Sequence, residues 1–95
     1  MAETKSITNY RVTDHARDEM IRRQITEEDV AKVLAAPEQT ETVREGREVY
    51  QRRFQSGEPP KAFLIRVFVD RDHVPPEVVT VYRTSKVAKY WRTVP

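Results

Sequence analysis

The fold of this chain is decided by a stretch of alternating side chains in its second half, which reads KAFLIRVFVD over residues 61–70. Residues two apart in a β-strand share one face of the sheet. One face of this strand is therefore entirely apolar and carries Phe63, Ile65, Val67 and Val69. The other face carries Leu64, Arg66 and Phe68. Because an arginine between apolar neighbours is not fully buried without a partner, we expect this second face to be partly exposed to water.

Three further segments read as strands on either side of this one. They are a weak segment at Thr40–Val43, an alternating segment at Glu48–Gln55 and a final segment at Glu77–Arg83. Glu45-Gly46 is a hairpin turn signal, and the prolines at 59–60 and 75–76 mark loops. In the last strand we expect Val79 and Val81 on the core side, with Thr80 and Tyr82 opposite. The short links favour antiparallel pairing.

Two helices are expected before these strands. Thr13 or Asp14 can cap a first helix that runs to about Arg23, with Ala16 and Met20 one turn apart on its buried side. Thr26 starts a second helix with acidic residues in its first turn, where the helix dipole favours them. Its apolar face consists of Val30, Val33 and Leu34, and Pro37 ends it. Residues 7–12 fit a short strand or an extended lead-in.

This order predicts a single α+β domain over residues 1–95, with residues 1–6 disordered. Two N-terminal helices would pack on one face of a curved antiparallel sheet of three to five strands. Arg66, Thr80 and Tyr82 would then lie on the other face, in a shallow, basic and partly aromatic concavity with His15 and one of Arg52 and Arg53 at its rim. The alternative is that Tyr90 and Trp91 pack back and cap that face.

Composition excludes several classes of function. There is no cysteine, so neither a disulfide framework nor a thiolate site can form. The two histidines lack metal-ligand spacing, and two glycines are too few for a phosphate-binding glycine loop, so we expect no metal and no cofactor. The longest apolar run is too short to cross a membrane and no signal peptide is evident, so a cytoplasmic location is expected.

Charge is unevenly distributed along the chain. Residues 1–47 have a net charge of −2 and residues 48–95 a net charge of +4, within a total of +2. The basic second half can attract a phosphate backbone or an acidic protein, although charged side chains also simply keep a small domain in solution.

Candidate functional residues follow from this charge and from the second face of the sheet. His15 can act as acid or base near neutral pH, with Glu19 and Arg22 at helical spacing to orient it, unless it is only an exposed helix histidine. Arg53 or Arg66 would stabilise a phosphate, and Tyr82 would transfer a proton or stack on a base. The nucleic-acid-binding candidates are Arg52, Thr80, Arg83 and Lys86. Arg52 and Arg53 point to opposite faces, and salt bridges to the N-terminal acids are an equally good explanation of both.

The N-terminal half also carries a family pattern. It consists of Tyr10-x-Val12-Thr13-x-His15-Ala16, Met20-x-x-Arg23-x-Ile25-Thr26 and Asp29-Val30, then Val33-Leu34 and Pro37; Tyr50-x-x-Arg53 and Val79-Thr80-Val81-Tyr82 continue it. Over residues 8–90 the chain resembles Domain of Unknown Function family 4258, with Gln24 where a glycine would be expected to close the first helix. The family distantly resembles the RelE/ParE-type toxin fold, some members of which cleave RNA without metal while others inhibit gyrase.

This resemblance implies a metal-independent, toxin-like domain that cleaves or binds RNA. Its partners would be RNA or the ribosome, and an antitoxin-like protein. The alternative is a catalytically inactive module that interacts with a protein or a nucleic acid.

Overall fold

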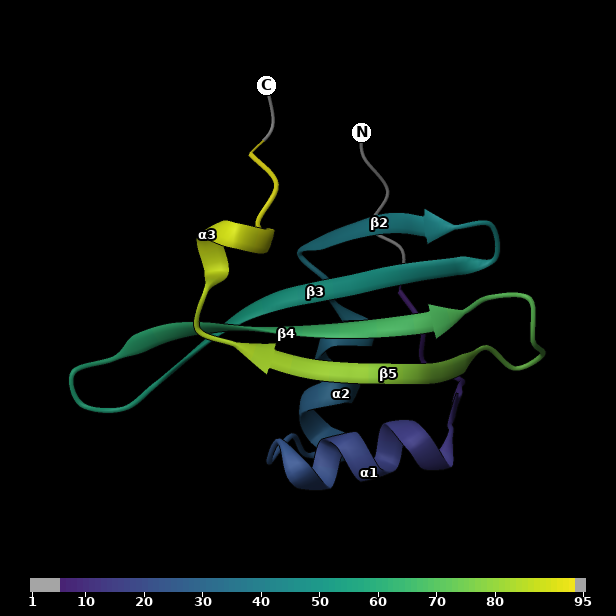
Figure 1. Ribbon diagram of the computed structural model, residues 1–95, viewed down its shortest axis with the longest axis horizontal. Coiled ribbons are helices and arrows are strands. Elements are labelled where there is room, and N and C mark those ends of the chain that lie inside the picture. Colours follow the sequence, from purple (N-terminus) through teal and green to yellow (C-terminus); the bar gives the residue numbers. More distant parts are fainter. Residues whose placement is uncertain (1–5, 94–95) are drawn as a thin grey trace.

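The computed structural model describes residues 6–93 (Figure 1). The expectation of disorder for residues 1–6 mostly concerns positions outside this range. The helices are α1 (Asp14–Arg22), α2 (Glu27–Ala35) and α3 (Val87–Tyr90). The strands are β1 (Arg11–Val12), β2 (Gln39–Arg44), β3 (Arg47–Ser56), β4 (Lys61–Asp70) and β5 (Glu77–Thr84). Both helices expected in the first half and the strand at residues 61–70 are therefore present.

The strands form one five-stranded sheet in the order β1-β5-β4-β3-β2. The pairs from β2 to β5 are antiparallel, as the short links predicted. The sheet as a whole is mixed, because β1 pairs with β5 in parallel. A parallel neighbour was not expected, since parallel strands need a long connection. Here that connection is the whole chain between Val12 and Glu77. β1 is held beside β5 by the Arg11 N–H, which donates to the Pro76 carbonyl at 2.9 Å.

Local hydrogen bonds explain where α1 and α2 begin. The Thr13 hydroxyl accepts from the Ala16 N–H at 3.1 Å and so caps α1. At the start of α2, Thr26 accepts from the Asp29 N–H at 3.0 Å, and the Asp29 carboxylate accepts from the Thr26 N–H at 3.2 Å. This reciprocal pair is a capping box, which satisfies two N–H groups that the helix itself leaves without partners.

The turn between the helices depends on Gln24. Its φ is +56°, in the left-handed region, and among residues 6–93 it is the one position other than glycine with a positive φ. The family pattern expects a glycine here, and the backbone indeed has the conformation that glycine favours. The geometry of the turn is thus kept although a side chain is present.

Replacing Gln24 by glycine is expected to stabilise the domain. The left-handed conformation costs a residue with a Cβ about 1–2 kcal/mol, whereas glycine avoids that cost but loses more chain entropy on folding. The expected net gain is up to about 1 kcal/mol in the free energy of unfolding. Urea denaturation followed by circular dichroism measures it. Gln24→Ala is the control, since it shortens the side chain without relieving the backbone; an equal gain from alanine would contradict the explanation.

The core lies between β3–β5 and the helices α1 and α2. From the helix side it contains Ala16, Met20, Val30, Val33 and Leu34, and from the sheet Tyr50, Ile65, Val67, Val69, Val78 and Val81. Phe63, expected here, packs only partly buried at the margin of this core. The expectation for Val79 was wrong, because Val78 takes its place. The register shifts by one residue between Phe68 and Val69, so the β5 strand bulges at that point and the alternation changes phase.

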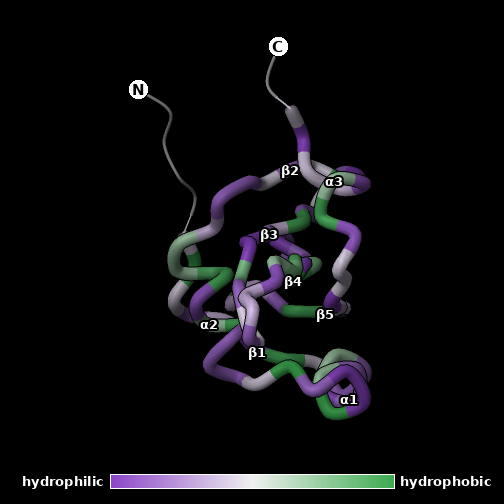
Figure 2. Tube along the Cα trace, turned by 90° about the vertical axis from the view of Figure 1, so that its left-hand side faces the viewer, coloured by the Kyte–Doolittle hydropathy of each residue, from purple (hydrophilic) through white to green (hydrophobic). Residues whose placement is uncertain are grey.

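The opposite face of the sheet is partly covered by the C-terminal segment. Figure 2 shows α2 and α3 on opposite sides of the sheet. Val49 and Leu64 are buried but lie outside the helix-side core. The Gln39 side chain joins the segment to the edge of the sheet: its amide donates to the Arg92 carbonyl at 2.8 Å and its oxygen accepts from the Arg92 N–H at 3.1 Å. Tyr90 and Trp91 therefore do pack back onto the domain, while much of this face stays half-exposed.

A cross-strand ion pair joins the first residue of β3 to the last residue of β4. Arg47 and Asp70 are register partners, and the guanidinium holds the carboxylate with bonds of 2.6 and 3.0 Å. The hydrogen bond from Arg47 is the main reason that the pKa of Asp70 is lowered, against the opposing effect of burial. Because the folded-state pKa is depressed, the stabilisation is present above the unfolded value of about 3.9 and is lost as pH falls below it.

Asp70→Asn is accordingly expected to destabilise the domain at pH 7 by about 1–2 kcal/mol, as for a partly buried bidentate pair. The difference from the wild type should shrink as the pH is lowered from 4 to 2. Urea denaturation at a series of pH values measures both. A difference that stays constant over this range would show that the carboxylate charge does not contribute.

Candidate functional site

The face of the sheet opposite α1 and α2 carries a group of polar and aromatic side chains, which we call the Arg66 cluster. Its members are Gln51, Arg66, Phe68, Tyr82 and Tyr90. The sheet register brings most of them together, because Arg66 in β4 is paired with Gln51 in β3 and with Tyr82 in β5. Alternation places them opposite the core, since Ile65 and Val67 on either side of Arg66 belong to the core. Tyr90 comes from α3.

Arg66 is half-buried and is held by neutral groups. Its Nε donates to Oε1 of Gln51 at 2.9 Å, and its Nη1 donates to the hydroxyl of Tyr82 at 2.5 Å. Its guanidinium carbon lies 4.6 Å from the ring centre of Tyr90, 5.4 Å from that of Phe68 and 5.5 Å from that of Tyr82. Among residues 6–93 no carboxylate pairs with it. The guanidinium group thus has a fixed orientation, and its positive charge is not neutralised. Both properties suit the binding of an anion.

The buried side chain of Gln51 is hydrogen-bonded to two other members of the cluster. It is 3% exposed, and its amide donates to Oε1 of Gln39 at 2.7 Å and to the carbonyl of Tyr90 at 3.2 Å. Its oxygen accepts from Arg66. The amide therefore fixes α3 while the oxygen fixes the guanidinium, so the position of Tyr90 relative to Arg66 depends on this side chain.

The two tyrosines of the cluster have opposite pKa shifts. Burial raises the pKa of Tyr82 and outweighs the hydrogen bond from Arg66, which lowers it; a hydrogen bond to Tyr90 adds to the rise. A hydrogen bond from Tyr82 lowers the pKa of Tyr90, and the charges of Lys89 and Arg66 lower it further. The rings pack edge to face with centres 5.8 Å apart. A pair of groups whose environments drive their pKa values apart is a typical arrangement for an acid and a base.

Arg53 lies on the same face, two residues from Gln51 along β3. Its guanidinium is stacked 4.0 Å from the ring centre of Trp91 and forms an ion pair with Glu38, Nε to Oε1 at 3.2 Å. A hydrogen bond from Arg53 is the main cause of the lowered pKa of Glu38. Since its charge is already compensated, Arg53 is less suited than Arg66 to hold a phosphate.

The structure does not bring His15 to this cluster. His15 is exposed in the first turn of α1, and α1 packs against the other face of the sheet through Ala16 and Met20. No hydrogen bond, ion pair or ring contact among the described residues joins it to Arg53, Arg66 or Tyr82. Because α1 packs on the core side of the sheet, the side chain of His15 does not take part in the cluster, and the expected rim position is not found.

The nucleic-acid-binding candidates are also divided between the two faces. Arg52 faces the helices and donates to the carbonyl of Ala36 at 2.8 Å, so it satisfies the C-terminal end of α2. Arg83 faces the same way and lines a pocket at one end of the sheet. Thr80 is half-buried and paired with Phe68 beside the cluster. Lys86 is exposed at the start of α3. Only Thr80 and Lys86 of these four therefore lie where the cluster can use them.

A family model described as domain of unknown function (DUF4258) matches residues 12–83. The chain belongs to this family. No curated protein and no solved structure matched it.

The DUF4258 match runs from β1 to the end of β5 and so includes Gln51, Arg66 and Tyr82, but not Tyr90. Gln51, Phe68 and Tyr90 are the members of the cluster that were not among the site residues expected from the sequence. Gln51 was visible as a polar residue on the face of Val49 and Arg53, but its partnership with Arg66 depends on the register. Within residues 6–93 there is no group of three or more metal-ligating side chains, and no helix long and apolar enough to span a membrane.

Proposed function

We propose that this domain binds single-stranded RNA through the Arg66 cluster and that it does so without a metal. The observation that carries the proposal is Arg66 itself, a half-buried cation without a carboxylate partner among the described residues, fixed by Gln51 and Tyr82 and surrounded by aromatic rings. A guanidinium fork suits a phosphate, and the half-exposed rings suit the faces of unpaired bases.

The surroundings of the cluster support the same function. Lys86 directly precedes α3 and Lys89 lies on it next to Tyr90, and neither has a carboxylate partner among the described residues. They extend the positive surface along the C-terminal segment, where a phosphate backbone could follow it. The family's distant resemblance to the RelE/ParE-type toxin fold, stated above from the sequence, adds an argument by fold analogy. On that analogy the RNA would be presented by the ribosome, and an antitoxin-like protein would cover the same face.

A cleaving activity is the second candidate, and it is favoured by the packing of two tyrosine rings against each other and around the guanidinium of Arg66. Tyr90, whose pKa is lowered, would take the proton from the 2′-hydroxyl as that oxygen attacks phosphorus. Tyr82, whose pKa is raised, would give a proton to the departing 5′-oxygen. Arg66 would stabilise the charge that develops on the phosphate. The products would be a 2′,3′-cyclic phosphate and a new 5′-hydroxyl end.

Fluorescence anisotropy with a labelled single-stranded RNA tests the binding proposal. The dissociation constant is expected to rise steeply with salt, and a plot of log Kd against log salt concentration should have a slope of about +0.7 for each phosphate contacted. A duplex of the same length serves as the control and should bind more weakly, because its bases are not free to stack. Absence of binding to RNA at low salt would exclude the proposal and favour a protein partner.

Incubation of free and ribosome-bound RNA in EDTA tests cleavage. If Tyr90 is the base, the rate should rise with pH above neutrality, because the phenolate is the active form and its pKa is lowered from that of an ordinary tyrosine. Tyr90→Phe should abolish this pH dependence, whereas His15→Ala should retain it. Cleavage lost with His15→Ala and kept with Tyr90→Phe would reverse the assignment.

A further inference from the structure

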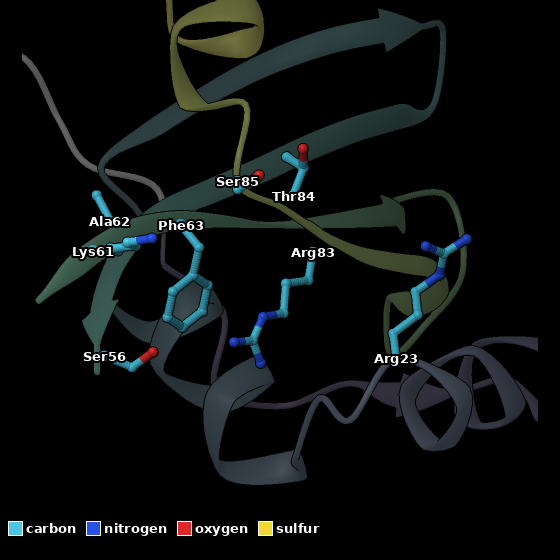
Figure 3. A pocket seen from close by; sticks show the side chains of 8 residues that line it. All are labelled: Arg23, Ser56, Lys61, Ala62, Phe63, Arg83, Thr84 and Ser85. Carbon is cyan, nitrogen blue, oxygen red and sulfur yellow. The ribbon is translucent and has the colours of Figure 1, made fainter. Parts of the chain in front are cut away.

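A second basic site lies on the helix side of the sheet, away from the Arg66 cluster. It is a pocket of about 490 Å³ at the end of the sheet where β3 ends, β4 begins and β5 ends (Figure 3). Arg23, the residue after α1, lies at its side. We call it the Arg83 pocket. Its lining consists of Arg23, Ser56, Lys61, Ala62, Phe63, Arg83, Thr84 and Ser85. The lining thus contains cations, hydroxyls and an aromatic ring, and no acid.

The guanidinium of Arg83 is oriented by stacking. Its central carbon lies 4.0 Å from the ring centre of Phe63, and Phe63 is itself stacked on Phe54 with centres 5.6 Å apart. Figure 3 shows the Arg83 and Phe63 side chains extending side by side in the same direction. Guanidinium N–H groups lie in the plane of the group, so stacking on its face leaves them free to donate. Among the described residues Arg83 has neither a side-chain hydrogen bond nor an ion pair.

The other charges of the pocket are also not neutralised in full. Lys61 has no carboxylate partner among residues 6–93, and it is cross-strand partner to Ser56. Arg23 shares the single carboxylate of Glu19 with Arg22, bonding to it through Nε at 3.2 Å. The terminal nitrogens of Arg23 are therefore left to other acceptors. Cations gathered without counter-charges repel one another, so an anion in the pocket would stabilise the arrangement.

We propose that the Arg83 pocket binds a terminal phosphate monoester. A dianionic phosphate offers several acceptor oxygens, and the helix side of the lining offers a guanidinium fork, an ammonium group and the hydroxyl of Ser56, the strand partner of Lys61, as donors. Pockets that hold small molecules have volumes of about 300–1,000 Å³, so this one has room for the group that carries the phosphate. That group is either a free nucleotide or the 5′ end of an RNA strand. The site is independent of RNA binding at the Arg66 cluster, because Arg83 and Arg66 lie on opposite faces of the sheet.

Titration of the ¹⁵N-labelled full chain, followed by heteronuclear NMR, tests the site. The probes are inorganic phosphate, adenosine 5′-monophosphate and adenosine. Both phosphates are expected to shift the resonances of residues 56–63 and 83–85, and adenosine is expected to shift none of them. Arg83→Gln should weaken the binding of adenosine 5′-monophosphate by roughly tenfold or more, since it removes charged hydrogen bonds. Lys61→Gln, at an exposed position, should weaken it as well and serves if Arg83→Gln impairs folding.

Arg44→Gln is the matched control, because Arg44 is an exposed arginine on the distant edge strand β2 and its loss changes the net charge equally. It should leave phosphate binding unchanged, as should Arg66→Lys, which separates this site from the RNA-binding proposal. An RNA with a 5′-phosphate that binds more tightly than the same RNA with a 5′-hydroxyl, and loses that advantage in Arg83→Gln, would identify the RNA end as the source. Tight binding of adenosine 5′-monophosphate without that advantage would identify a free nucleotide. Equal binding of adenosine, or equal loss in Arg44→Gln, would overturn the proposal.

Discussion

Arg66→Lys is expected to weaken the binding of single-stranded RNA by roughly ten- to a hundredfold, the loss that removal of charged hydrogen bonds typically gives. Lysine keeps the positive charge, so the general attraction to RNA should remain. It lacks the planar fork, however, and cannot donate in the plane to Gln51 and Tyr82 while its face lies against the rings. If the domain cleaves RNA, the rate should fall further, by about 10²–10³, as expected when a stabiliser of the transition state is lost.

Anisotropy titrations at fixed salt measure the effect on binding. Arg44→Lys is the matched control, because it makes the same chemical change at an exposed position on β2. The circular dichroism spectrum and the urea midpoint of Arg66→Lys show whether the sheet is intact. Binding by Arg66→Lys equal to that of the wild type, in a folded protein, would mean that the Arg66 cluster is not the RNA site.

Leu34→Ala is expected to lower the free energy of unfolding by about 2–5 kcal/mol. Leu34 is fully buried in α2, packs in the core between the helices and the sheet, and its carbonyl accepts from the Ile7 N–H at 2.8 Å. The loss combines the transfer free energy of the deleted methyl groups with the cavity left behind, since neighbours on a rigid sheet relax only in part. For a domain of this size such a loss is a large fraction of the whole stability.

Ile21→Ala on α1 is the corresponding control, because Ile21 is 72% exposed and its truncation should change the free energy of unfolding by less than about 0.5 kcal/mol. Urea denaturation of both variants measures the difference. Similar effects from the two substitutions would show that α2 is not packed as described. These two free energies of unfolding also give a scale for the stability of variants such as Arg66→Lys, since a loss of RNA binding is interpretable only in a protein that remains folded.

Several features of the molecule follow from the sequence alone. Hydrophobic alternation at residues 61–70 identified the central strand and the face that meets the helices, because a period of two is a local property of strands. The capping residues Thr13 and Thr26 and the turn at Glu45-Gly46 could be predicted for the same reason, since each acts on neighbours a few residues away. The family pattern likewise marked the left-handed turn at Gln24.

The tertiary structure alone decided what depends on register and on elements distant in the sequence. The bulge in β5 exchanged Val79 for Val78 in the core, and no local signal specifies on which residue a bulge falls. Pairing of Arg66 with Gln51 and Tyr82 requires the alignment of three strands, and the position of Tyr90 requires the C-terminal segment to fold back over them. His15 does not lie in the cluster, because α1 packs against the other face of the sheet. The sequence by itself thus determined which side chains share a strand face, whereas packing between strands and helices determined which of them meet.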